Sequence, residues 1–259
     1  MSGGRLTGKT ALVTGSTRGI GRDIATRLAS EGCNLVVHGR DINDARQAAA
    51  ELRERGVETL PLAADLSQIE DAHRLADETF AAVPRLDILV NNAGMSIREH
   101  FWEVSDANFD YQLNVNFRSP YILAQHAARH MIGQAIAGRI INTSTIGAHL
   151  AHADAAVYDS AKAAVEAMTR NMGWELGPHR ITVNCVVPGP IGDRPGATEP
   201  EGMWDKIAPY VTVGRVGSGM DIAAAVAFFC LPETEFITGQ SLIIDGGYGA
   251  PLQENYANL

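Results

Sequence analysis

Tyr158 and Lys162 are the two residues of this sequence best suited to acid/base chemistry. Their spacing of four residues, within an alanine-rich stretch, places both side chains on one face of a helix, one turn apart. A tyrosine with its usual pKa of about 10 is a poor base at neutral pH. A neighbouring ammonium group stabilises the phenolate and lowers that pKa. The pair therefore predicts proton exchange with an alcohol or a carbonyl oxygen.

The second chemical signal is the glycine-rich segment 14–21, TGSTRGIG, which directly follows an apolar stretch. Glycine permits positive φ and lets the main chain approach a pyrophosphate closely. The helix that starts in this segment offers free amide hydrogens and partial positive charge to phosphates. A glycine-rich segment alone could be a tight turn, but the strand–turn–helix context favours a dinucleotide site. The spacing is G-x-x-x-G-x-G, not the usual G-x-G-x-x-G.

Strand and helix patterns alternate along the chain. Apolar stretches with the strand pattern lie at 10–14, 34–37, 58–62, 87–90, 139–143, 181–187 and 241–245. Helical patterns lie at 20–32, 42–56, 68–83, 106–136, 155–176 and 221–231. Near-continuous apolar strands separated by helices are typical of a parallel sheet covered on both faces. We therefore expect one α/β domain, a doubly wound Rossmann-type sheet of about seven strands, with ligands at the carboxyl ends of the strands.

The composition limits the other classes of function. Of the 259 residues, 46% are hydrophobic and 20% are charged, which is typical of a globular domain. No apolar run approaches the roughly 18 residues of a membrane span, and the first nine residues lack the apolar core of a signal peptide. The net charge of −9 disfavours nucleic acid as a partner. Cys33, Cys185 and Cys230 have no metal or redox spacing, which predicts buried thiols in a reducing cytoplasm.

Six further motifs, in order along residues 6–247, resemble those of the short-chain dehydrogenase/reductase family. They are Asp65-Leu66, Asn91-Asn92-Ala93-Gly94, Asn116, Tyr158-x-x-x-Lys162, Pro188-Gly189-Pro190-Ile191, and Thr238-Gly239 with Asp245-Gly246-Gly247. Each falls at a strand end or within a helix. The resemblance implies an oxidoreductase in which hydride moves to or from a nicotinamide while Tyr158 moves the proton.

The resemblance also implies roles for three other residues. Lys162 tunes the tyrosine and binds ribose. The main chain of Asn116 holds a water that links the lysine to solvent, and Pro120, which has no amide hydrogen, leaves the carbonyl of Asn116 without a helical partner. The family carries a serine 13 residues before the tyrosine, where this chain has Thr145. Threonine keeps the hydroxyl that holds the substrate oxygen but adds a methyl group.

The end of the second strand bears on the choice of dinucleotide. NAD-binding relatives carry a carboxylate there for the ribose 2′-hydroxyl, but this chain has Gly39 followed by Arg40. With Arg18 in the glycine-rich loop, two guanidinium groups can bracket a 2′-phosphate. We therefore expect NADP(H) in preference to NAD(H). The alternative is that both arginines are solvated surface charges; Asp41 lies one residue too late for the NAD role.

The expected cofactor site also takes in Asp65, near the adenine amino group, although this aspartate could instead cap the turn that contains Ser67. Asp193 stands where similar chains often carry a threonine that contacts the cofactor. The sequence therefore does not predict this one contact. The complete expected set of cofactor-binding residues is Gly15, Ser16, Thr17, Arg18, Gly19, Ile20, Gly21, Arg40, Asp65, Leu66, Asn92, Ala93, Gly94, Tyr158, Lys162, Pro188, Gly189 and Ile191.

The sequence gives fewer signals for the substrate site than for the cofactor site. We expect residues 6–190 to form the cofactor-binding and catalytic core, 192–213 a flap over the substrate, and 248–259 a C-terminal tail. His100, His149 and His152 flank the expected pocket, but their spacing does not suit a zinc site, and we expect no metal. The mixture of aromatic and polar groups suits a ketone, a polyol, a sugar or an acyl thioester.

The sequence thus predicts an NADP(H)-dependent oxidoreductase that interconverts a secondary alcohol and a ketone, similar to 3-oxoacyl-carrier-protein reductases or to sugar, polyol and ketone reductases. One alternative is an NAD-dependent sugar or polyol dehydrogenase. Another is a cofactor-binding regulatory or scaffold protein with little turnover. The resemblance further implies a homotetramer with 222 symmetry, paired through the long helices and the C-terminal strand region.

Overall fold

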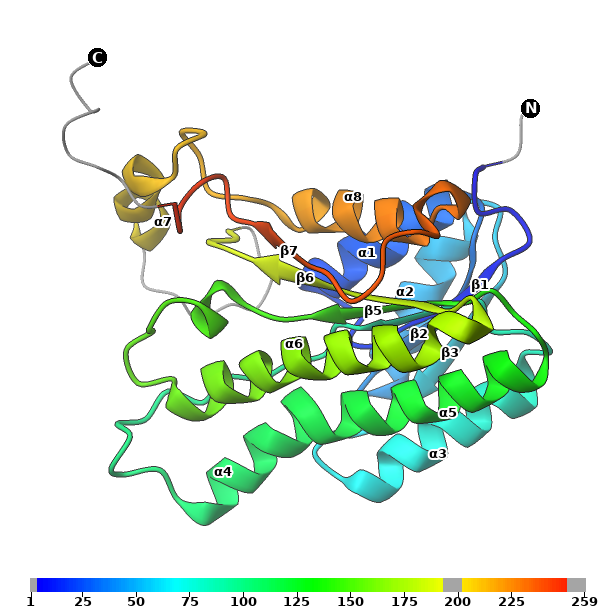
Figure 1. Cartoon of the computed structure of the whole chain (residues 1–259), viewed down its shortest axis with the longest axis horizontal. Coiled ribbons are helices and arrows are strands. Elements are labelled where there is room, and N and C mark those ends of the chain that lie inside the picture. The colour runs from blue at the N-terminus through cyan, green and yellow to red at the C-terminus, as the bar shows by residue number, and fades with distance from the viewer. Residues whose placement is uncertain (1–3, 193–201, 251–259) are drawn as a thin grey trace.

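The computed structural model describes residues 4–192 and 202–250, which contain one parallel sheet of seven strands in the order β3-β2-β1-β4-β5-β6-β7 (Figure 1). The strands are β1 (Thr10–Val13), β2 (Asn34–Gly39), β3 (Thr59–Ala63), β4 (Ile88–Asn91), β5 (Arg139–Thr143), β6 (Thr182–Pro188) and β7 (Ser241–Ile244). The chain reverses its direction of winding between β1 and β4, which is where a doubly wound sheet binds its ligand. The expected α/β class and the seven-stranded sheet are confirmed.

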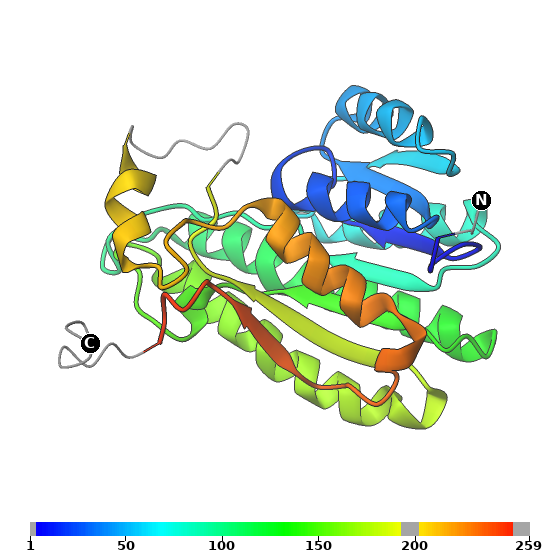
Figure 2. The ribbon, with the colours of Figure 1, turned by 90° about the horizontal axis from the view of Figure 1, so that it is seen from above.

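Two layers of helices cover the sheet (Figures 1 and 2). One face carries α1 (Gly19–Ser30), α2 (Ile42–Arg53) and α8 (Gly219–Cys230). The other carries α3 (Ile69–Ala82), α4 (Asp106–Leu113), α5 (Ser119–Gly133) and α6 (Ala156–Leu176). Most of these elements differ from the predicted ranges by one to three residues at their ends.

The central strands β1 and β4 are apolar on both faces because each face meets a separate core. On β1, Ala11 and Val13 pack into the core beneath α1 and α8, whereas Leu12 packs into the core beneath α3 and α5. The same alternation holds on β4, where Leu89 faces opposite to its two neighbours. A strand buried on both faces shows no hydrophobic alternation along its sequence, which is the pattern of these central strands.

The stretch predicted as one helix over 106–136 is three elements. Between α4 and α5 lies a π-helical turn, Asn114–Arg118, in which the amide of Ser119 donates to the carbonyl of Asn114. The sequence predicts a helical carbonyl without a partner at Asn116, because Pro120 lacks an amide hydrogen. The structure shows a wider disturbance that begins two residues earlier. Single π-helical turns inside helices occur frequently at functional sites.

The region between β6 and α8 was expected to lack regular elements. The structure shows the short helix α7 (Met203–Ile207) there, followed by a single 3₁₀ turn, Ala208–Tyr210. Asp193, with the rest of 193–201 in the expected flap, and most of the tail, 251–259, lie outside the described residues. In the part of the chain that is described, no helix is long and apolar enough to cross a membrane.

Candidate active site

Tyr158 and Lys162 lie one turn apart near the start of α6, as their spacing predicts. The Nζ atom of Lys162 is 5.8 Å from the centroid of the Tyr158 ring, and it donates a hydrogen bond of 2.9 Å to the carbonyl of Thr143 at the end of β5. Lys162 is buried, and this burial lowers its pKa to about 8, against an opposing effect of Cys185. The lysine is therefore a fixed group beneath the tyrosine ring and not a surface charge.

Thr145 and Ser144 follow β5 and point to different partners. The Oγ1 atom of Thr145 accepts a hydrogen bond of 3.3 Å from the amide of Gly147 and caps the 3₁₀ turn Ile146–Ala148. The hydroxyl of Ser144 donates instead to the buried carboxylate of Glu166 on α6, at 2.7 Å. Thr145 thus places its hydroxyl at the start of the β5–α6 loop, whereas the hydroxyl of Ser144 is hydrogen-bonded to α6.

Asn116 sits in the π-helical turn, fully buried. Its amide nitrogen donates to the carbonyls of Met95, at 2.6 Å, and Gln112, at 2.8 Å, and its Oδ1 accepts from the amide of Met95 at 3.1 Å. A Cβ atom at Gly94 would lie 3.1 Å from Oδ1 of Asn116 and 3.3 Å from Nζ of Lys162. The glycine therefore lets the segment after β4, the π-helical turn and α6 converge.

The glycine-rich loop has the geometry that a pyrophosphate requires. Gly15 and Gly19 have φ of +65° and +55°, which favours glycine. A Cβ atom at Gly21 would collide with the carbonyl of Gly15 and the amide of Asn92. Helix α1 begins at Gly19, and the preceding Arg18 makes no side-chain cap. The first amides of α1 are therefore available to an anion, and the loop fits the phosphates of a dinucleotide.

His38 was not among the predicted site residues, although it holds this loop. Its Nδ1 accepts the amide hydrogen of Gly15 at 3.0 Å, so Nε2 carries the proton and donates to the carbonyl of Ala64 at 3.1 Å. Its main chain forms two more hydrogen bonds with Ser16, of 2.9 and 3.0 Å. Burial lowers the pKa of His38 to about 4. The only signal in the sequence is a histidine at the end of an otherwise apolar strand.

Asn92 and Asp65 make internal contacts at the edge of the cofactor site. The Asn92 amide donates to the carbonyl of Thr14 at 3.0 Å, and the Thr14 hydroxyl accepts from the main chain of Asn92 at 2.9 Å. Asp65 accepts from the amide of Ser67 at 3.0 Å, so the capping interaction considered for this aspartate is present. Each of these contacts fixes the loop that carries the residue, after β4 for Asn92 and after β3 for Asp65.

The predicted binding site for the 2′-phosphate, at Arg18 and Arg40, is exposed to solvent. Arg18 and Arg40 are exposed, and neither side chain forms a hydrogen bond or an ion pair with a described residue. A Cβ atom at Gly39 would lie 2.5 Å from Cγ2 of Thr17, so a carboxylate at this position has no room unless Thr17 moves. Asp41 caps α2 by accepting from the amide of Asn43 at 2.6 Å. Beside Arg18 lies a pocket of about 220 Å³, lined by Thr17, Arg18, Asp44, Gln47, Ala48 and Glu51.

The segment after β6 is fixed against β7. The amide of Gly189 donates to the carbonyl of Ile244 at 3.0 Å, and a Cβ atom at Gly189 would collide with Asp245. Ile191 forms a parallel bridge with Gly217. Pro188, Gly189 and Ile191 thus leave the sheet at the same edge as the glycine-rich loop and the Tyr158–Lys162 pair.

Comparisons with known proteins show the family to which this chain belongs. A family model described as Enoyl-(Acyl carrier protein) reductase matches residues 15–249. The 3-oxoacyl-(acyl-carrier-protein) reductase FabG of Aquifex aeolicus is 34% identical over 244 residues, which cover 94% of this chain and 98% of that protein. A short-chain type dehydrogenase/reductase from Mycobacterium marinum has a TM-score of 0.89 at 29% identity, covering 95% and 97% of the two chains.

The chain belongs to the short-chain dehydrogenase/reductase family. It is therefore an NAD(P)-dependent oxidoreductase that acts on CH–OH and C=O groups. A further solved structure, a blue fluorescent protein from a metagenomic library in complex with NADPH, has a TM-score of 0.86 at 31% identity and covers 95% of this chain and all of its own, 100%.

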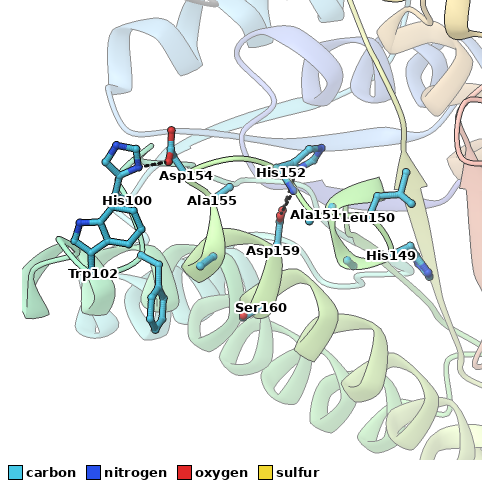
Figure 3. Close-up of a pocket in the computed structure, with 14 residues that line it drawn as sticks. His100, Trp102, His149, Leu150, Ala151, His152, Asp154, Ala155, Asp159 and Ser160 are labelled. Carbon is cyan, nitrogen blue, oxygen red and sulfur yellow. Dashed lines mark hydrogen bonds and ion pairs between the residues drawn. The ribbon is translucent and has the colours of Figure 1, made fainter.

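In this short-chain dehydrogenase/reductase, the three histidines expected near the substrate line one pocket of about 550 Å³ (Figure 3). Each is paired with a carboxylate: His100 with Asp154 at 2.6 Å, His152 with Asp159 at 3.1 Å and His149 with Glu166 at 3.1 Å. Neither Tyr158 nor Lys162 lines this pocket. Among the described residues, no group of three or more histidine, cysteine or acidic side chains could hold a metal ion.

Proposed function

We propose that this short-chain dehydrogenase/reductase uses NADP(H) to interconvert a secondary alcohol and a ketone. The observation that carries the proposal is the buried ammonium of Lys162 held 5.8 Å from the centroid of the Tyr158 ring. A phenol is a useful acid or base near neutral pH only beside such a charge. The proposed catalytic residues are Asn116, Thr145, Tyr158 and Lys162.

In the reductive direction, Tyr158 gives its proton to the carbonyl oxygen of the substrate, and Lys162 stabilises the phenolate that remains. The hydroxyl of Thr145 holds the same oxygen by a hydrogen bond. The nicotinamide supplies the hydride when the cofactor is bound. The main chain of Asn116 anchors a water through which the lysine exchanges protons with solvent. The oxidative direction reverses these steps, with Tyr158 as the base.

The preference for NADP(H) over NAD(H) is supported by the residues around the predicted 2′-phosphate site. Arg18 and Arg40 are free to contact a phosphate, and Thr17 occupies the space that a carboxylate at Gly39 would need. Asp41 is engaged in capping α2, which disfavours the NAD-dependent alternative. The similar structure solved with NADPH is consistent with this choice. The proposed cofactor site otherwise comprises the residues predicted from the sequence, with the core at 6–190, the flap at 192–213 and the tail at 248–259.

The substrate proposal follows the relatives. One of them is a reductase of 3-oxoacyl groups on a carrier protein, so a 3-oxoacyl thioester or a simple ketone is the first candidate. The test follows by absorbance the oxidation of NADPH and NADH with a panel of 3-oxoacyl thioesters, ketones and sugars, and the reduction of NADP and NAD with polyols. Turnover of polyols with NAD alone supports the alternative dehydrogenase. Cofactor binding without turnover of any member supports a regulatory or scaffold role.

The proposed assembly is a homotetramer in the cytoplasm. Leu242 and Ile243 on the edge strand β7 and Phe228 on α8 are exposed apolar side chains, which is unusual for a monomer surface. Cys33, Cys185 and Cys230 are buried free thiols, consistent with a reducing compartment. Size exclusion with light scattering tests the assembly: the 27.7 kDa mass of one chain contradicts it.

A further inference from the structure

Glu166 is a buried carboxylate on α6 that has no part in the mechanism proposed above. It follows Lys162 at the same four-residue interval at which Lys162 follows Tyr158, so the three side chains lie along one side of the helix. The side chain of Glu166 is only 7% exposed. A carboxylate is rarely buried to this degree unless it is paired, so its partners identify what it holds in place.

Two side chains of the loop after β5 meet this carboxylate. The hydroxyl of Ser144 donates to Oε1 of Glu166 at 2.7 Å, and Nε2 of His149 lies 3.1 Å from Oε1 and 3.2 Å from Oε2. With its proton on Nε2, the imidazole donates to the carboxylate. Ser144 directly follows β5, and His149 directly follows the 3₁₀ turn Ile146–Ala148. One side chain of α6 therefore binds both ends of the segment 144–149.

The hydroxyl of Thr145, which lies inside this segment, is held weakly by its own contact. Its Oγ1 accepts from the amide of Gly147 at 3.3 Å, which is long for a hydrogen bond between an amide and an oxygen. A group that must meet a reacting atom needs to be placed to within about 0.5 Å. The main chain on both sides of Thr145 must therefore supply this precision.

The two ends of the segment are fixed in different ways. At its start, the amide of Ser144 donates to the carbonyl of Val186 on β6 at 2.8 Å, so the sheet holds this end. At its other end, the amide of His149 donates to the carbonyl of Ile146 at 2.9 Å, within the segment itself. The contact between the His149 imidazole and Glu166 therefore ties this end to α6, the helix of the catalytic pair.

We propose that Glu166 is a positioning residue for the reaction, which holds the segment 144–149 on α6 so that the hydroxyl of Thr145 keeps a fixed place relative to Tyr158. The proposal rests on the role of Thr145 proposed above. Tyr158 and Thr145 must meet the same substrate oxygen, although one belongs to a helix and the other to a loop. Because Glu166 belongs to the helix of Tyr158 and binds the loop of Thr145, it joins the two groups. It acts through Thr145 and not on the reacting atoms.

A carboxylate suits this position better than a neutral acceptor. Hydrogen bonds to an ionised acceptor are shorter than neutral ones and roughly twice as strong, and the 2.7 Å contact with Ser144 is short. The same hydroxyl also lies 3.2 Å from the carbonyl of Lys162, but it has one proton, and the carboxylate is the closer acceptor. The two oxygens of the carboxylate also let one side chain serve two donors.

The test asks whether the effect of Glu166 passes through Thr145. Glu166→Leu removes both hydrogen bonds, so kcat should fall by up to the factor expected for Thr145→Ala, about 2- to 13-fold. In the Thr145→Ala variant, the same change should alter kcat by less than about twofold, because the hydroxyl that Glu166 positions is already absent. Glu166→Gln should restore most of kcat, since its amide can accept from Ser144 and meet His149. Fluorescence titration should show an NADPH affinity close to that of the parent in every variant.

Thr169→Val is the matched control on the same helix. The Oγ1 atom of Thr169 is buried and accepts from the side chain of Asn142 at 2.9 Å, so this change also removes a buried hydrogen bond between α6 and the β5 region. It should lower the urea midpoint of unfolding, as Glu166→Leu does. Its effect on kcat should be the same in the parent and in the Thr145→Ala variant, because Thr169 does not hold the segment 144–149.

An effect of Glu166→Leu on kcat that is equal in the parent and in the Thr145→Ala variant overturns the inference, and so does full activity of Glu166→Leu. If Glu166→Leu does not fold, Ser144→Ala carries the same comparison, since it removes one hydrogen bond and leaves the carboxylate paired with His149. A parent protein that turns over no substrate contradicts the proposed function together with this inference. An active parent without the coupling to Thr145 contradicts the inference alone.

Discussion

His38 accepts the amide hydrogen of Gly15 at 3.0 Å, so a side chain of β2 holds the first turn of the glycine-rich loop. The same imidazole donates to the carbonyl of Ala64 after β3. Three neighbouring strands, β1, β2 and β3, are therefore joined at their carboxyl ends by one neutral ring. Because both ring nitrogens are used, neither protonation nor an apolar replacement leaves this arrangement intact.

Replacing His38 by leucine should destabilise the protein and weaken NADPH binding. The change leaves the half-buried amide of Gly15 and the buried carbonyl of Ala64 without partners, and a buried group of this kind costs about 1–3 kcal/mol. Urea unfolding should show a loss of about 2–4 kcal/mol. The matched control is His179→Leu, at an exposed histidine, which should leave both stability and NADPH affinity unchanged. Equal stability of the two variants would falsify the role of His38.

The stability of the protein should fall with acid through His38. Its pKa is lowered to about 4 in the folded state, while an unfolded histidine titrates near 6.5, so the unfolded chain binds the extra proton between these values. Stability therefore rises with pH from about 4 to 6.5, by about 3 kcal/mol for this group. His38→Gln lacks the titration, so its difference in unfolding free energy from the parent should shrink as pH falls. A difference that stays constant from pH 7 to pH 5 contradicts this assignment.

Tyr158→Phe should abolish turnover and leave cofactor binding nearly intact, because the ring remains and only the transferable proton is lost. General acid/base catalysis contributes about 10²–10⁴-fold, so kcat should fall by at least that lower bound. Steady-state rates and NADPH fluorescence titration measure the two quantities separately. A variant that retains more than a few per cent of kcat excludes Tyr158 as the acid/base.

Arg40→Asp should weaken NADPH binding by more than about 1.5 kcal/mol, the lower end for a charged hydrogen bond, and affect NADH little. Arg46→Asp makes the same change of charge on the exposed side of α2 and separates the specific contact from the general field. Fluorescence titration of both variants with both cofactors gives the comparison. Equal affinities of the parent for NADH and NADPH would rule out a 2′-phosphate contact.

Thr145→Ser should preserve or raise activity, since the hydroxyl remains and the methyl group that crowds the pocket is removed. Thr145→Ala should lower kcat by about 2- to 13-fold, because the hydrogen bond to the substrate oxygen, about 0.5–1.5 kcal/mol for a neutral pair, is lost together with the cap of the 3₁₀ turn. The kinetic constants of the two variants are compared directly. Loss of activity in the serine variant would show that the methyl group is needed.

The sequence predicted the elements well where one local pattern determines them. The segment at 139–143, with Ile140 and Ile141 near its centre, is β5 without change, and all five of its residues are buried. The four-residue spacing of Tyr158 and Lys162 likewise placed them on one helix face. Both patterns are local, because each involves only residues that lie close together in the sequence.

Features that join distant segments could not be predicted in this way. The bonds of His38 depend on how β1, β2 and β3 lie side by side, and its own sequence context shows only a strand. The convergence of Gly94, Asn116 and Lys162 requires three elements to meet. Pro120 indicated an interrupted helix, but the widened turn at Asn114 depends on the packing of the whole helix. The sequence allowed Asp65 either to cap the turn that contains Ser67 or to contact the cofactor, and the structure shows the capping hydrogen bond.

The π-helical turn between α4 and α5 also sets the length of this segment. Such a turn contains one residue more than an α-helix would over the same rise, and each residue rotates the helix by about 100°. Leu123, Ala127 and Met131 face the core only with that extra rotation, while Gln112 before the turn still accepts the amide of Ile97 at 2.9 Å. Deleting one residue from 114–118 would either turn Leu123, Ala127 and Met131 away from the core or turn Gln112 away from the amide of Ile97. This helix therefore tolerates substitutions far better than a change in the number of its residues.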